Sequence, residues 1–110
     1  MVKLVVDSSV AFKWFVEESL SSEARHILDG FRAGTFDVYV PDLMFAELGN
    51  ILWKKERLHG LARQDALEII QTVLQLGLVF VTSEALVEQA YALAIENGRT
   101  VYDSLYVALA

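Results

Sequence analysis

Short apolar runs alternate with longer amphipathic stretches along the chain. Three runs, at residues 3–6, 37–40 and 78–82, are mostly apolar and end at polar or turn-forming residues. A run of this kind is typical of a strand that is buried on both faces in a parallel sheet. We therefore expect three parallel β-strands.

Between and after these runs, apolar residues recur at the three- and four-residue spacing of helices. The spacing predicts helices over residues 10–18, 21–31, 42–58 and 62–76, one that Ser83 caps and Gly98 ends, and one over residues 101–110 that follows Thr100. Strands separated by helices that can cross back over the sheet indicate an α/β fold, with a parallel sheet flanked by helices.

The composition excludes several classes of protein. With 110 residues, of which 55% are apolar, the chain fits one small globular domain over residues 1–110. The absence of cysteine excludes disulfide scaffolds and thiol nucleophiles, and it suits the cytoplasmic location that we expect. Because no apolar stretch reaches the roughly 20 residues of a membrane-spanning helix, we expect no membrane partner. The net charge of −6 argues against nucleic-acid binding through bulk positive potential, but not against an enzyme whose carboxylates bind cations.

Asp7 is the first candidate for chemistry, because it directly follows the first predicted strand. Ligands of open parallel sheets bind beyond the carboxyl ends of the strands, and this carboxylate would stand at that edge. The alternative is that Asp7 or Ser8 merely caps the next helix, as is common at such turns. This residue alone does not decide between the two.

Glu47 is the second candidate, because it lies in a helical pattern with Met44 and Ile51 on its own side. An uncompensated buried carboxylate is costly, so we expect Glu47 to meet a cation, a hydrogen-bond donor or a metal. The alternative is a position at the rim of the apolar stripe.

Asp103 is the third candidate. Thr100 followed by Asp103 resembles a capping box, and an acid in a first turn is stabilised by the helix dipole, so a structural role alone would explain it. The residues that follow are almost wholly apolar, however, so we expect this helix to be buried and its N-terminus to open at the edge of the sheet.

Together the three acids suggest a metal site. Mg²⁺ and Mn²⁺ take oxygen ligands and need only a few carboxylates besides waters and a substrate phosphate. Such a cation can generate a nucleophile from water near neutral pH and stabilise charge on a transferring phosphoryl group. It would also offset the repulsion between an acidic chain and a phosphate substrate.

Three segments, at residues 4–10, 41–52 and 102–110, resemble the PIN domain in their order and spacing, and in particular the VapC-type ribonuclease toxins of toxin–antitoxin pairs. The resemblance implies a PIN-like fold in which Asp7, Glu47 and Asp103 bind Mg²⁺ or Mn²⁺ and activate water to cleave within RNA. It also implies an antitoxin partner and a homodimer.

The same resemblance places Ser9 beside the site, two residues after the first acid. Two basic residues are expected to position RNA phosphates: Lys13, one turn beyond Ser9, and Arg99, just before the last predicted helix.

One part of the family pattern is missing from the sequence. The family usually has a fourth acidic residue after a further strand, and another of its strands flanks the first. Here the last predicted helix reaches Ala110 without a capping signal. We therefore expect that C-terminal strands are missing, that the chain is truncated or a degenerate relative, and that the first strand has an open edge.

The aromatic residues of the first helix predict an interface. Phe12, Trp14 and Phe15 should not all face inward on so short a helix, and an exposed remainder would mark a surface for a second copy or an antitoxin. Trp53 and Leu58 are candidates for the same surface.

Two other functions stay open from the sequence. The missing fourth acid favours a catalytically inactive binding or assembly module. A nucleophilic aspartate, as in aspartate-dependent phosphatases, is the least favoured, because such enzymes have Asp-x-Asp where this chain has Asp7 and then Ser9.

Overall fold

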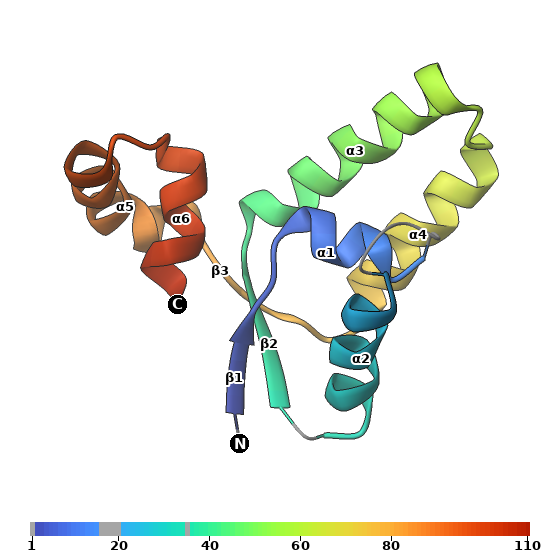
Figure 1. Cartoon of the computed structure of the whole chain (residues 1–110), viewed down its shortest axis with the longest axis horizontal. Coiled ribbons are helices and arrows are strands. Elements are labelled where there is room, and N and C mark those ends of the chain that lie inside the picture. Colours follow the sequence, from blue (N-terminus) through green and yellow to red (C-terminus); the bar gives the residue numbers. More distant parts are fainter. Residues whose placement is uncertain (1, 16–20, 35) are drawn as a thin grey trace.

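A parallel sheet lies between two groups of helices in the computed structural model, which describes residues 2–15, 21–34 and 36–110 (Figure 1). The elements follow the order β1 (Val2–Val5), α1 (Ser8–Lys13), α2 (Ser21–Arg32), β2 (Phe36–Pro41), α3 (Leu43–His59), α4 (Arg63–Gln75), β3 (Val79–Val81), α5 (Ser83–Asn97) and α6 (Val101–Leu109). Figure 1 shows α1 to α4 on one side of the strands, and α5 and α6 as a separate pair on the other. The α/β fold with parallel strands is thus confirmed.

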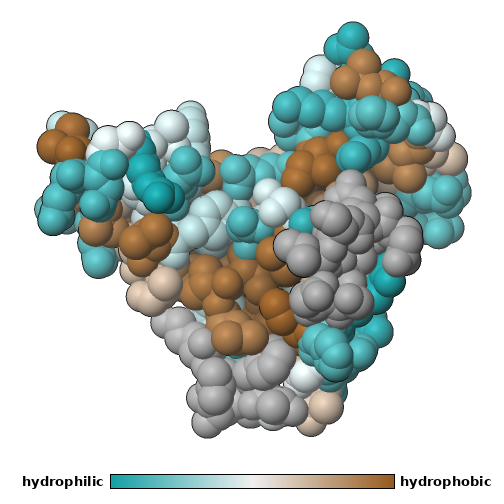
Figure 2. Space-filling view, viewed as in Figure 1, coloured by the Kyte–Doolittle hydropathy of each residue, from teal (hydrophilic) through white to brown (hydrophobic). Residues whose placement is uncertain are grey.

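The sheet has the order β1-β2-β3, and both pairings are parallel. Leu4 lies opposite Val38, and Val40 lies opposite Phe80. Within the described residues β1 therefore has a neighbour on one side only, as expected for an open edge. Apolar side chains gather at the surface over the strands in this view (Figure 2).

The expectation of strands buried on both faces is wrong for β3, and Leu4 and Val5 of β1 are only partly buried. Val79 and Phe80 are exposed, because β3 is a short edge strand. The ring of Phe80 meets that of Phe45 on α3 edge-on, with centroids 6.0 Å apart. By contrast Val38 and Val40 on the central strand β2 are fully buried.

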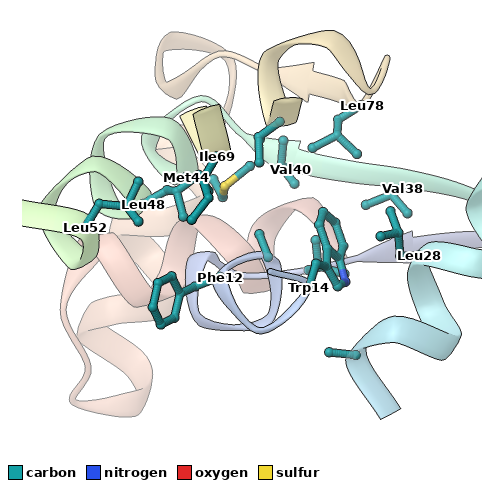
Figure 3. Packing of buried hydrophobic residues seen from close by; sticks show 14 of the residues in the cluster. Phe12, Trp14, Leu28, Val38, Val40, Met44, Leu48, Leu52, Ile69 and Leu78 are labelled. Carbon is teal, nitrogen blue, oxygen red and sulfur yellow. The ribbon is translucent and has the colours of Figure 1, made fainter. Parts of the chain in front are cut away.

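Two apolar clusters hold the helices in place. The larger one joins β2 to α1, α2, α3 and α4, and Met44, Leu48 and Leu52 of α3 lie in it (Figure 3). The smaller one joins α5 to α6 through Leu86, Ala90, Leu105 and Leu109. The α5–α6 pair consequently packs on the rest of the molecule mainly through the strands and the start of α3.

Two helices end at glycine, and the end of α5 at Gly98 agrees with the prediction. Gly60 and Gly98 both adopt the left-handed conformation, with φ of 73° and 65°, and end α3 and α5. This conformation is easy for glycine and strained for residues with a Cβ atom.

The cap of α5 is Thr82 rather than Ser83, which corrects the prediction. The Thr82 hydroxyl accepts a hydrogen bond from the backbone N–H of Ala85. Ser83 instead donates from its backbone N–H and its hydroxyl to Oδ1 of Asp42, at 3.1 and 2.5 Å. Asp42 thereby ties the residue before α3 to the first residue of α5.

The first helix begins two residues earlier than predicted, at Ser8, and residues 16–18 of the prediction lie outside the described part of the chain. The expectation of an exposed aromatic remainder there is wrong for Phe12 and Trp14, which are only 4% and 5% exposed, and Phe15 is partly buried. They are covered because α1 packs between α2 and α3. Trp53 and Leu58 are exposed, as predicted.

In the part of the chain that the structure describes, no helix is both long and apolar enough to cross a lipid bilayer.

Candidate active site

Asp7 lies where β1 gives way to α1, beyond the carboxyl end of the strand. Its Oδ1 atom accepts two hydrogen bonds, from the Ser9 hydroxyl at 2.7 Å and from the Val10 backbone N–H at 3.0 Å. Asp7 is therefore the N-cap of α1, which is the capping role that the sequence offered as the alternative to chemistry. Neither of these bonds uses Oδ2, so capping leaves that oxygen for another ligand.

Glu47 projects from the second turn of α3 and is partly buried. It meets a hydrogen-bond donor, as its surroundings predicted, because the hydroxyl of Tyr106 donates to Oε1 of Glu47. These residues are 59 positions apart, and their contact connects α3 to α6.

Tyr106 is held in its protonated form. Burial is the main cause that raises the pKa of its hydroxyl well above the usual value, and the negative charges of Glu47 and Asp7 raise it further. Ser8 acts weakly in the opposite direction. Tyr106 is thus a permanent donor to Glu47 over the ordinary range of pH.

Asp103 lies in the first turn of α6, and Thr100 caps this helix. The Thr100 hydroxyl accepts a hydrogen bond of 3.1 Å from the Asp103 backbone N–H, and the buried Ser104 hydroxyl donates to the Thr100 carbonyl at 2.9 Å. This is half of the expected capping box. The Asp103 carboxylate is exposed.

The three acids line one hollow of about 570 Å³ at the carboxyl edge of the sheet. In Figure 1, α6 stands across from the N-terminal ends of α1 and α3. Asp7 caps α1 and Glu47 lies in the second turn of α3, so both reach the hollow that Asp103 of α6 also lines. The other residues that line the hollow are Val5, Ser8, Ser9, Arg99, Tyr106, Val107 and Ala110.

The expected phosphate-binding residues behave differently from one another. Ser9 and Arg99 line the hollow with the acids, whereas Lys13, at the end of α1, is not among its lining residues.

Sequence reasoning missed Tyr106. Its position three residues after Asp103 in an apolar helix was the available signal, since such a spacing places both side chains on one face.

The donor set around the hollow fits a hard divalent cation, because every acidic ligand offers oxygen. The acids do not form a closed cage: within the described residues, no three acidic or histidine side chains are close enough together to hold one ion. Mg²⁺ commonly keeps several waters and binds one or two carboxylates directly, so an open arrangement of this kind remains compatible with it.

A comparison with known proteins identifies the family of this chain. The family model of the PIN domain matches residues 4–110. The chain belongs to the PIN domain family. The expectation drawn from its three motifs is confirmed, and the parallel sheet with flanking helices is consistent with a PIN fold.

A named relative of this PIN domain is ribonuclease VapC3 of Pyrobaculum aerophilum. The two are 36% identical over 113 residues, which span 99% of this chain and 82% of the relative. Asp7, Glu47 and Asp103 all lie within the residues that the PIN domain model matches.

Proposed function

We propose that this PIN domain is a VapC-type endoribonuclease that hydrolyses RNA phosphodiester bonds with water activated by Mg²⁺ or Mn²⁺. The observation that carries the proposal is the meeting of three carboxylates at one hollow, although they come from β1–α1, α3 and α6. The likeness to a protein named as a ribonuclease supports the substrate class.

In this proposal Asp7, Glu47 and Asp103 bind the cation, directly or through waters. When bound, the cation supplies a nucleophile from water near neutral pH and offsets negative charge on the phosphate. Asp7 performs two tasks, since Oδ1 caps α1 while Oδ2 is available to the site. The hydrogen bond from Ser9 fixes the orientation of that carboxylate.

Arg99 binds the RNA phosphate at the rim of the hollow. It is exposed, lines the hollow beside Asp103 and has the paired N–H groups that suit a phosphate. Its charge lowers the repulsion that an acidic chain presents to RNA. That Lys13 also positions RNA phosphates stays a prediction from the sequence.

The proposed partners are an antitoxin and a second copy of the chain, in the cytoplasm where RNA substrates occur. An exposed apolar patch supports a protein partner: it contains Trp53 and Leu58 on α3, with Lys54 and Arg57 between them. The Arg57 guanidinium lies over the Trp53 ring, 4.9 Å from its centre.

The open spacing of the acids favours a second candidate, an inactive PIN-like binding or assembly module. The two proposals differ in metal dependence.

We expect the purified chain to cleave RNA internally with Mg²⁺ or Mn²⁺, to lose all measurable activity in excess EDTA, and to regain it when the metal is returned.

Gel analysis of a 5′-labelled RNA measures this cleavage, and Asp103→Asn purified in the same way serves as the control for contaminating ribonucleases. Cleavage that persists in EDTA, or that equals wild type in Asp103→Asn, would contradict the proposed enzyme. Absence of cleavage with either metal would favour the module.

A further inference from the structure

Tyr106 links the two apolar clusters of the molecule. Its neighbours Leu105 and Leu109 belong to the small cluster between α5 and α6, whereas the Tyr106 ring packs against the large cluster of the other helices. The ring is therefore held by residues outside the α5–α6 pair. This fixes the position of its hydroxyl relative to α3.

That hydroxyl donates a hydrogen bond to Oε1 of Glu47. A glutamate side chain has three rotatable bonds, and holding it in one geometry has an entropic cost. A tyrosine hydroxyl held by the core supplies a fixed donor and so restricts the carboxylate. Because the bond occupies Oε1, Glu47 presents Oε2 as its more available oxygen.

We propose that Tyr106 is a positioning residue, which orients Glu47 for divalent-metal binding and thereby couples α6 to the carboxylate of α3. The inference rests on the proposed function only in taking Glu47 as a metal ligand. Partners in hydrogen bonds to metal-binding side chains orient those ligands and tune the affinity of metal sites.

The arrangement of α6 supports this role. Asp103 and Tyr106 are three residues apart, so both lie on the face of α6 that lines the hollow. One turn of one helix thus brings a carboxylate to the site and positions a second carboxylate on another helix. A displacement of α6 would disturb both acids together.

Tyr106→Phe tests the proposal, because phenylalanine keeps the partly buried ring and removes the hydroxyl. We expect Mn²⁺ to bind about tenfold more weakly to this variant in calorimetric titrations. We also expect kcat for RNA cleavage to fall while the KM for RNA stays unchanged. Tyr102→Phe is the matched control: Tyr102 lies one turn earlier on α6, is 64% exposed, and should leave both measurements at wild-type values.

A second substitution separates positioning from a purely structural role. In a Glu47→Gln background no carboxylate remains to be oriented, so Tyr106→Phe should cause no further loss of Mn²⁺ affinity. An equal loss in both backgrounds, or unchanged Mn²⁺ affinity in Tyr106→Phe, would overturn the proposal. A lower unfolding temperature with unchanged metal affinity would also overturn it, because the hydroxyl would then serve packing alone.

The result distinguishes this inference from the proposed function. If wild type binds Mn²⁺ but does not cleave RNA, weaker Mn²⁺ binding by Tyr106→Phe would support positioning while the nuclease proposal fails. If wild type cleaves RNA and Tyr106→Phe matches it in kcat and metal affinity, positioning fails while the nuclease proposal stands. A wild-type chain that binds no divalent metal would overturn positioning.

Discussion

Asp7→Asn should reduce metal-dependent RNA cleavage by about 100-fold or more while leaving the fold intact. The reason is that Asp7 has two tasks that one substitution separates. Asparagine caps helices about as well as aspartate, so its side-chain oxygen can accept the hydrogen bonds from Ser9 and Val10. Only the negative charge is lost, and a cation needs that charge.

Cleavage rates at saturating Mg²⁺ and urea unfolding measure the two consequences. The free energy of unfolding should change by less than about 0.5 kcal/mol. Asp65→Asn is the matched control, since Asp65 is an exposed acid in the first turn of α4 that does not line the hollow. Wild-type cleavage by Asp7→Asn would remove Asp7 from the mechanism.

Leu52→Ala should lower the free energy of unfolding by about 2–5 kcal/mol. Leu52 is 1% exposed and lies in the large cluster with Leu48. Its truncation removes apolar contacts and leaves a cavity. Alanine is the best helix former, so α3 itself is not weakened.

Leu58→Ala on the same helix provides the comparison, because Leu58 is 68% exposed. Its free energy of unfolding should stay within about 0.5 kcal/mol of wild type. Urea titrations of the three proteins measure both changes. Equal losses in the two variants would show that burial in the large cluster is not what stabilises α3.

The element order could be predicted from the sequence, because strong local signals mark it. The apolar runs fall on the strands, and glycines that adopt positive φ end α3 and α5. Asp7 could be predicted in the same way, since a strand followed at once by an acid places it at the carboxyl edge of a parallel sheet.

Other features depended on contacts between distant residues. Ser83 has the residue type of a helix cap, but Asp42 binds it and Thr82 caps instead. Phe12 and Trp14 are buried because α2 and α3 both pack against α1, which a helical pattern in α1 does not reveal.

The candidate site shows the same limit. Glu47 was expected to meet a hydrogen-bond donor. The donor is Tyr106, which the sequence pattern does not distinguish from the apolar residues around it in a buried helix. Lys13 was placed by its spacing from Ser9 alone, and α1 carries it away from the residues that line the hollow.

The most direct test of the account is calorimetric titration of Mn²⁺ into the wild-type chain and into Glu47→Gln. We propose that acids from separate elements form one metal site. Glu47 is the acid to substitute, because Asp7 caps α1 and Asp103 lies in the first turn of α6, whereas Glu47 lies in the second turn of α3. We expect a defined Mn²⁺ site in wild type and binding at least about tenfold weaker in Glu47→Gln. Identical isotherms for the two proteins, or no binding to wild type, would contradict it.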